Sequence, residues 1–502
     1  MSYLKSFAGE NPNYKNEIFA GLTVAMTMIP ESLSFAILAG LSPLSGLYAA
    51  FIMGLFTALF GGRPGMVSGG AGATVIVLIA LMKSHGVEYV FGAVALAGII
   101  QFFVGLLKLG KFVRLIPQSV MYGFVNGLAI VIFMSQLEQF KVFASSGYSW
   151  LSGNPLYSMA GLVMLTIAVV LLFPKITKFI PSSLVAILVV FAVVTGFNIP
   201  TKTVADMASI AGGFPPFHIP SIPFTWEAFT IILPYAGIMA CVGLLETLLT
   251  LSLVDEITKT RGSANRECMA QGGANLINGF FTGMGGCAMI AQTFVNLEAG
   301  SKGRLSGVIA AVTILLVILF GAPLIGQLPM AALVGVMMIV ALRTFNWGSF
   351  SLISKVPISD MIVIFMVTAV TVIFHNLALA VFIGVVLSAL VFCWESSRRI
   401  RARKYINAQG VKHYELYGPL FFGSVTTFLE IFDVHADPEE VILDFKDCRI
   451  SDLSAMEALN KLAILYKEEG KHIKLIHLSE DCIKLLNQAK DLMVIDSDLN
   501  KS

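Results

Sequence analysis

The sequence predicts an α-helical membrane protein with many membrane-spanning segments, followed by a small α/β domain near its C-terminal end. Three observations predict this fold class. Of the 502 residues, 56% are hydrophobic and only 13% are charged, whereas soluble proteins carry roughly 25% charged residues. Apolar stretches long enough to cross a bilayer recur along most of the chain. From Arg398 onward, the composition becomes that of a soluble domain.

Apolar stretches of about 17–25 residues are long enough to cross a bilayer as helices. The third and tenth stretches of this chain are short and rich in glycine, so we expect broken segments there rather than plain helices. The 14 predicted membrane segments lie near residues 18–40, 45–61, 67–83, 88–108, 115–138, 156–174, 180–197, 229–254, 267–284, 287–300, 304–321, 328–344, 358–376 and 378–397.

Lysine and arginine residues in the loops predict the orientation. With a cytoplasmic N-terminus (residues 1–16), 15 of these basic residues fall inside and only Lys83, Lys141 and Lys202 fall outside. This distribution follows the positive-inside rule. The even number of segments puts the basic linker 398–410 in the cytoplasm, beside anionic lipid headgroups. We therefore predict a multi-pass protein of the cell (inner) membrane with both termini in the cytoplasm.

The two broken segments occupy matching places in the two halves of the chain, seven segments apart. Gly69, Gly70 and Gly72 precede the apolar run of the third segment, and Gly285 and Gly286 precede that of the tenth. A helix that begins inside the membrane points free N–H groups and the positive end of its dipole at the membrane centre. Two such helix starts facing each other form an anion site. The alternative is that the glycines only permit close helix packing.

Two glutamates lie within apolar segments, where charged side chains indicate function. Glu31 lies in the first segment and Glu246 in the eighth, again seven apart, and Thr250 follows one turn after Glu246. A buried carboxyl group favours its neutral form, which would couple a proton to anion binding. Alternatively, a sodium ion near Glu246 and Thr250 would couple transport. A third interpretation is that each glutamate only accepts hydrogen bonds from the broken helices.

The C-terminal tail predicts strands that alternate with helices, which is typical of an α/β domain over residues 411–496. Ser479 is the expected N-cap of the last helix. The strands are expected at 412–416, 420–422, 441–445 and 472–477, and the helices at 425–432, 452–467 and 479–490.

Several classes of function are disfavoured. A net charge of +2 gives no indication of nucleic-acid binding. The six cysteines are scattered without metal-ligand spacing, and the seven histidines are dispersed. We therefore expect neither an enzyme nor a bound metal or cofactor.

Several motifs together resemble the SulP family of anion transporters. They are Pro30-Glu31, the run AGLSPLSGLY at 39–48, GGRP at 61–64 and QGGAN at 271–275. The resemblance implies a transport domain at 17–397 built as two inverted seven-segment repeats. Its core would comprise about 17–108 and 229–321, and its gate about 115–197 and 328–397. It further implies a homodimer and an elevator-type movement of core against gate.

In this family the anion lies between the starts of segments three and ten. Matching the motifs places it near Ala71, Gly72, Ala73, Ala291 and Gln292, with Glu246 lining the pocket. Many relatives carry Gln where this chain has Glu31, and animal relatives carry an Arg where Gln292 stands. The first difference favours proton coupling, and the second makes the pocket less positive.

The tail resembles the STAS fold through residues 441–445 and 452–455. Bacterial anti-sigma antagonists carry a phosphorylated Ser where this chain has Leu453, so that switch is not expected. The predicted role of the tail is assembly, trafficking or binding of a cytoplasmic partner. Taken together, the sequence predicts a secondary active transporter of a small inorganic anion, sulfate or bicarbonate, coupled to H⁺ or Na⁺. The alternatives are a dicarboxylate (fumarate or succinate) symporter, or an uncoupled anion channel or exchanger.

Overall fold

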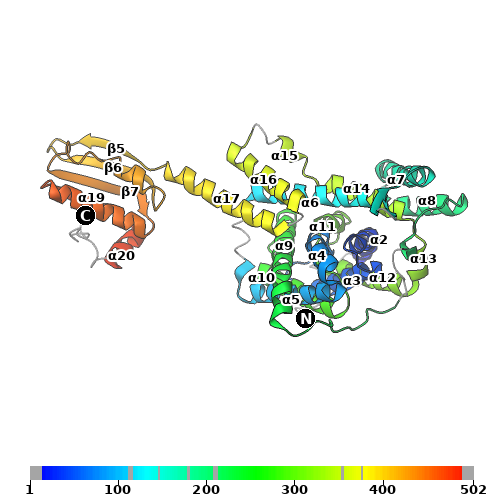
Figure 1. The fold of residues 1–502 in the computed structure, drawn as a ribbon. Coiled ribbons are helices and arrows are strands. Elements are labelled where there is room, and N and C mark those ends of the chain that lie inside the picture. Colours follow the sequence, from blue (N-terminus) through cyan, green and yellow to red (C-terminus); the bar gives the residue numbers. More distant parts are fainter. Residues whose placement is uncertain are drawn as a thin grey trace. The chain divides into compact units, whose positions relative to one another are not determined.

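The protein is represented by a computed structural model that describes residues 14–110, 117–144, 147–177, 181–206, 213–351, 355–374 and 377–488 (Figure 1). Most of the predicted N-terminal region 1–16, and residues 489–496 of the predicted tail domain, lie outside the described residues. The chain divides into two compact units, residues 1–385 and 386–502, each described here by itself.

Each of the apolar stretches expected from the sequence contains a helix. Eight helices are long and apolar enough to cross a membrane, and four shorter apolar helices accompany them in the described part of the chain. The helices that correspond to the apolar stretches are α2 (Tyr14–Leu38), α3 (Pro43–Phe60), α4 (Gly72–His85), α5 (Val87–Leu106), α6 (Gln118–Glu138), α7 (Asn154–Leu172), α8 (Ser182–Gly196), α9 (Trp226–Thr258), α10 (Ala264–Phe280), α11 (Ile290–Glu298), α12 (Leu305–Phe320), α14 (Met330–Thr344), α16 (Ile358–Phe374) and α17 (Leu377–Ser397).

Short elements join these helices. The antiparallel strands β2 and β3 follow α6, and an isolated bridge joins Thr203 to Pro329. The short elements are β2 (Lys141–Ala144), β3 (Gly147–Trp150), the 3₁₀ turns Phe173–Lys175 and Val204–Asp206, α13 (Ala322–Gly326) and α15 (Gly348–Ser351).

The helices of the first unit pack in two groups. In what we call the first group, α2, α3 and α12 pack together, and α5 packs against α9 and α10. Helix α4 of this group packs against α9, and α11 packs against α2 and α9. In the second group, α6 packs against α14 and α16, and α7 against α8 and α14. Helices α2 and α14 are in contact across the two groups.

Glycine allows α5 and α10 to approach each other closely. A Cβ atom on Gly98 would lie 2.3 Å from the backbone nitrogen of Leu276, and one on Gly272 would lie 2.3 Å from that of Phe102. Small residues at helix contacts are typical of membrane proteins. In lipid there is no hydrophobic driving force between helices, so their association depends on close packing of the backbones.

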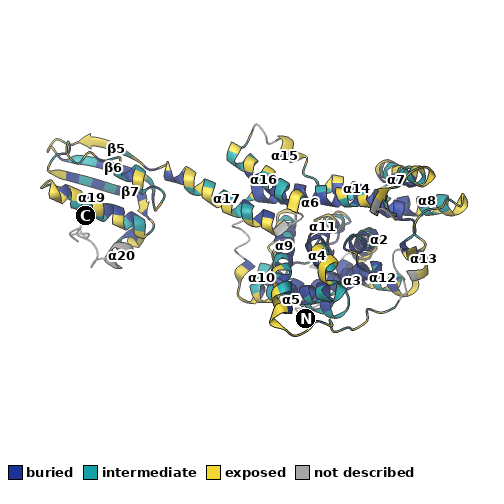
Figure 2. Cartoon of the chain, viewed as in Figure 1, coloured by how far each residue is buried: buried dark blue, intermediate teal, exposed yellow. Residues whose placement is uncertain are grey.

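Many large apolar side chains of α7, α16 and α17 are exposed, in contrast to those of α3 (Figure 2). Helices whose apolar residues lie on the outside are expected in a protein surrounded by lipid. The exposed residues include Met164, Leu171, Phe365, Ile373, Phe382, Leu390 and Phe392.

The two broken segments cross as a short antiparallel sheet. Strand β1 (Ser68–Gly70) precedes α4, and β4 (Gly286–Ala288) precedes α11. Ser68 is opposite Ala288, Gly69 is opposite Cys287, and Gly70 is opposite Gly286. Extended backbone inside a membrane needs partners for its N–H and C=O groups, and here each strand supplies them to the other.

The second unit contains a four-stranded sheet with the order β5-β6-β7-β8. Strand β5 runs antiparallel to β6, and β6, β7 and β8 are mutually parallel. The buried side chains of the sheet and of α19 form one hydrophobic core. The elements are β5 (Arg401–Ile406), β6 (Lys412–Leu420), α18 (Val425–Leu429), β7 (Glu440–Ile450), α19 (Leu453–Glu468), β8 (His472–Ile476) and α20 (Glu480–Gln488).

Two expectations for the tail need correction. The basic stretch 398–410 is not a plain linker, because Arg401–Ile406 forms β5. Its side chains are mostly exposed, so the strand lacks the alternation of apolar and polar residues from which it could be predicted. The strand expected at 412–416 extends to Leu420 as β6, with a register irregularity between Glu415 and Tyr417. The separate strand expected at 420–422 is absent, because Phe421 and Phe422 lie in the turn after β6. Ser479 is the helix-start acceptor as predicted, because its Oγ accepts the N–H of Cys482 at 3.3 Å.

Asp437 forms a buried polar centre in this domain. Its carboxylate accepts hydrogen bonds from Lys412, Tyr414 and Tyr466, the Tyr414 bond measuring 2.7 Å. Burial alone would raise the pKa of Asp437, but the hydrogen bonds from Lys412 and the two tyrosines hold that pKa below its ordinary value. The carboxylate therefore ties β6 and α19 to the loop before β7.

Candidate functional site

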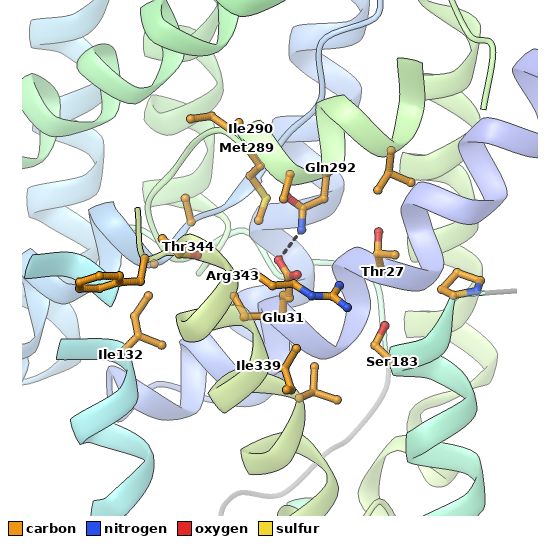
Figure 3. Close-up of a pocket in the computed structure, with 18 of the residues that line it drawn as sticks. Thr27, Glu31, Ile132, Ser183, Met289, Ile290, Gln292, Ile339, Arg343 and Thr344 are labelled. Carbon is orange, nitrogen blue, oxygen red and sulfur yellow. Dashed lines mark hydrogen bonds between the residues drawn. The ribbon is translucent and has the colours of Figure 1, made fainter. Parts of the chain in front are cut away.

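A cavity of about 1500 Å³ lies in the first unit between the two helix groups (Figure 3). The first group supplies its walls from α2, α4, α9 and α11, and the second group from α6, α7, α8 and α14. The sequence-predicted residues that line it are Glu31, Ala71, Gly72, Ala73, Glu246, Ala291 and Gln292. Thr250 is not among the lining residues.

The helices α4 and α11 both begin at this cavity. Their N-caps, Ala71 and Met289, have extended backbone and lack a side-chain cap among the described residues. The first N–H groups of a helix have no partner within the helix, so both helix starts present free donors and partial positive charge. Gly72 is required by close packing, because a Cβ atom there would lie 2.5 Å from the ring of Phe35.

Side chains from neighbouring helices hold the crossing point in place. Asn275 of α10 donates to the carbonyl of Gly286 and accepts its N–H, both at 2.9 Å. Thr74 donates to the carbonyl of Gly285 at 3.0 Å, and Thr247 accepts the N–H of Ala288 at 3.2 Å. The backbone donors and acceptors that β1 and β4 do not satisfy are thus partly satisfied by α4, α9 and α10.

A second set of hydrogen bonds joins the two broken segments next to the Ser68–Ala288 pair, at the start of α11. The N–H of Met289 donates to the carbonyl of Val67 at 2.9 Å, and the Oγ1 of Thr293 accepts the N–H of Val67 at 3.0 Å. Both bonds lie directly beside the start of α11. The position of this helix start is therefore fixed by residues of the first broken segment.

Glu31 lies in the cavity on α2 and accepts a hydrogen bond from the amide of Gln292 on α11 (Figure 3). The bond brings together two residues that the sequence analysis assigned to different roles, ion coupling and anion binding. It also links α2 directly to the start of α11. Any change in the charge of Glu31 will therefore alter the partner of Gln292.

Glu246 also lines the cavity, and it accepts a hydrogen bond of 3.0 Å from the thiol of Cys287 on β4. Thr250 is fully buried, and its hydroxyl donates to the backbone carbonyl of Glu246 at 2.8 Å. Its hydroxyl is thus used within α9 and does not lie beside the Glu246 carboxylate in the cavity. The expected pairing of these two side chains at one ion site remains a prediction.

The sequence analysis did not place Arg343, at the end of α14, in the site. The positive-inside rule treats a basic residue at a segment end as a sign of topology, and gives no reason to expect it in the site. In the structure Arg343 lines the cavity, and it lies beside Glu31, within range of electrostatic attraction (Figure 3). Its charge in an otherwise apolar segment was the available signal.

Among the described residues, no group of three or more His, Cys, Asp or Glu side chains is arranged to hold a metal ion. The cavity instead combines two helix starts, three carboxyl groups and one guanidinium group. Such a site suits a small hydrated anion together with a proton or a monovalent cation.

Comparison with family models assigns most of the chain. Residues 14–368 match the model described as the sulfate permease family, and residues 404–498 match that of the STAS domain. A Bacillus subtilis protein named "Putative sulfate transporter YbaR" is 39% identical over 95% of this chain and 97% of its own length. A Picosynechococcus protein named bicarbonate transporter BicA is 29% identical over 89% of this chain and 86% of its own length.

Solved structures show the same fold. The transmembrane domain of a cyanobacterial BicA covers 75% of this chain and 97% of its own, with 27% identity and a TM-score of 0.63. The murine anion transporter Slc26a9 in its inward-facing state covers 97% of this chain and 89% of its own, with 18% identity and a TM-score of 0.84.

Proposed function

Since this chain belongs to the sulfate permease (SulP) family and carries a STAS domain, we propose that it is a secondary active transporter of a small inorganic anion. The chain is a membrane transporter and not an enzyme. Sulfate and bicarbonate are the proposed substrates, because the relatives reported above are named for these two anions.

One observation carries the proposal: the starts of α4 and α11 open on the same cavity. Ala71, Gly72 and Ala73 line it from α4, and Ala291 and Gln292 line it from α11. Free N–H groups at two helix starts attract an anion without a buried cation. The glycine and alanine residues leave room for the anion to approach the backbone.

Coupling to H⁺ or Na⁺ is proposed from the two carboxylates. Glu31 and Glu246 both line the cavity where the anion would bind. An anion is repelled by a charged carboxylate at short range, so its binding favours the uptake of a proton or another cation by the same site. For this reason we favour symport over an uncoupled channel or exchanger. Sodium held near Glu246 and Thr250 is the alternative coupling ion.

An elevator-type movement is proposed from the division of the helices. The first group corresponds to the core expected from the sequence, residues 17–108 and 229–321, and the second group to the gate. The cavity lies between them, so movement of the first group past the second would carry the helix starts across the membrane. We propose fourteen segments in two inverted repeats, with the β1–β4 crossing as the point where the repeats meet.

The orientation follows from the ends of the cavity. The lining includes residues at the ends of several segments, namely Pro174, Thr177, Pro181, Ser182, Ser183, Glu298, Ala299 and the stretch 343–347. These segment ends adjoin basic residues that the sequence analysis placed in the cytoplasm. The cavity is therefore proposed to open inward. We further propose a cell-membrane homodimer with cytoplasmic termini, whose STAS domain binds a cytoplasmic partner.

Uptake into proteoliposomes tests the proposal. Purified protein is reconstituted, and radiolabelled sulfate, bicarbonate and fumarate are offered with and without an inward proton or sodium gradient. Saturable uptake of sulfate or bicarbonate that rises with one gradient is expected. If fumarate alone is taken up, the substrate is a dicarboxylate and not an inorganic anion. If none of the three anions is taken up, the proposal is contradicted.

A further inference from the structure

We propose that Arg343 binds the entering anion first when the cavity is open. Arg343 lies on the second helix group, whereas the two helix starts belong to the first group. This inference rests on the proposed function. It assigns the positive charge of the site to α14, far in sequence from the two broken segments.

Arg343 provides the positively charged side chain of the cavity. Among the described residues that line it, Arg343 is the single basic side chain, against the three acidic side chains of Glu31, Glu246 and Glu298. The guanidinium group is exposed, and within the described part of the chain it forms no hydrogen bond and no ion pair shorter than 4.0 Å. An arginine with free donors is well suited to an oxyanion, because its planar fork binds two oxygens at once.

The nearest opposite charge is Glu31, which lies beside Arg343 but is hydrogen-bonded to Gln292 (Figure 3). Glu31 attracts Arg343 without occupying its donors. The arginine is therefore held in the cavity by electrostatic attraction while its N–H groups remain available. An entering anion takes these donors, and Glu31 keeps its bond to Gln292.

The two parts of the site belong to different helix groups. The helix starts and both coupling carboxylates lie on α2, α4, α9 and α11, whereas Arg343 lies on α14. If the first group moves against the second, the anion travels with the helix starts and leaves Arg343 behind. Arg343 therefore contributes to binding at the face on which the cavity now opens, and not at the opposite face.

The test compares half-saturating anion concentrations in inside-out and right-side-out membrane vesicles. Arg343→Gln removes the charge, and Arg343→Lys keeps it. Lys259→Gln is the matched control, because Lys259 is an exposed basic residue that does not line the cavity. Loss of a charge-assisted hydrogen bond is expected to raise the half-saturating concentration about 10-fold or more for R343Q, in inside-out vesicles only. R343K is expected to lie between R343Q and the wild type, and K259Q to match the wild type.

Should R343Q fail to fold, the double variant E31Q/R343Q is used, because it keeps the net charge of the wild-type cavity. It is compared with E31Q, from which it differs only by the charge at residue 343. The same one-sided rise is expected. An unchanged half-saturating concentration at both faces, or an equal rise at both, would overturn the role of Arg343. Absence of anion transport by the wild type would instead overturn the proposed function, so the two failures are distinguishable.

Discussion

Asn275 forms two hydrogen bonds of 2.9 Å with the backbone of Gly286, one to its carbonyl and one from its N–H. Its side chain thus forms the hydrogen bonds that a neighbouring strand would form on the side of β4 away from β1. Its Nδ2 also donates to Gln101 of α5 at 2.9 Å. A single side chain of α10 thereby fixes the entry to the second broken segment.

Asn275→Ala is expected to lower the thermal stability of the purified protein and to abolish most uptake. Each buried backbone group left unpaired costs about 1–3 kcal/mol, and two are left here. The midpoint of thermal unfolding in detergent and the initial rate of uptake are the measurements. Asn154→Ala, at an exposed position, serves as the control, and equal stability of the two variants would contradict the role given to Asn275.

Gly286→Ala is expected to disrupt the crossing of β1 and β4. A Cβ atom at Gly286 would lie 2.4 Å from the carbonyl oxygen of Gly69, which belongs to the backbone of the paired strand. Gly161→Ala in α7 is the control, since a Cβ atom there meets nothing within 4 Å. Transport by G286A should fall at least about 10-fold while G161A transports normally. Normal uptake by G286A would show that the crossing tolerates widening.

Glu31→Gln and Glu246→Gln are expected to remove the dependence of uptake on the coupling ion. The amide keeps the size of the side chain but neither takes up a proton nor attracts a cation. Initial rates are measured against external pH between 5 and 8 and against sodium concentration. If both variants keep the ion dependence of the wild type, coupling does not reside in these carboxylates.

Asp437→Ala is expected to loosen the STAS domain. Removing one partner of a buried ion pair costs about 3 kcal/mol, because the other charge is left unpaired. The side chain of Asp437 is fully buried, and that of Lys412 is 18% exposed. Hydrogen–deuterium exchange of the full-length protein should quicken in the peptides of β6 and α19. Asp447→Ala, at an exposed residue of β7 outside this network, is the control.

The same carboxylate predicts how the stability of the STAS domain depends on pH. The pKa of Asp437 lies below its ordinary value of 3.8 in the folded protein. Its stabilising effect is therefore complete above the unfolded pKa and is lost as the pH falls through the lower, folded value. Protection of β6 and α19 in the wild type should hold at pH 5 and decline below about pH 4. Loss of protection that begins near pH 6 would assign the effect to other groups.

The apolar stretches and the two glycine clusters were predictable from the sequence, because both depend on local composition. A helix that crosses a bilayer needs a run of apolar residues, and a broken helix needs glycine where the backbone turns. The matching positions of the glycines at 69–72 and 285–286 in the two halves therefore predicted the two helix starts that open on the cavity. Whether the anion binds there is a proposal that the variants above test.

Arg343 and β5 were not predictable in the same way. A basic residue at a segment end has the same local sequence whether it contacts lipid headgroups or lines a cavity, and only the packing of α14 against α2 distinguishes the two. The strand β5 is mostly exposed, so its charged side chains do not alternate with apolar ones. Thr250 was predicted from helical spacing, which places a residue on a face but does not say whether its hydroxyl bonds back to its own helix.

The crossing of β1 and β4 imposes an order on biosynthesis. Val67 and Thr293, which are hydrogen-bonded beside the crossing, are 226 residues apart in the chain. The ribosome therefore completes the first half long before any partner for β1 exists, and unpaired backbone is costly in hydrocarbon. The unpaired backbone of the first broken segment is therefore expected to stay shielded from lipid, for example within the insertion machinery, until the second half has been inserted. A chain truncated after α8 is accordingly expected to be recognised and degraded as incomplete.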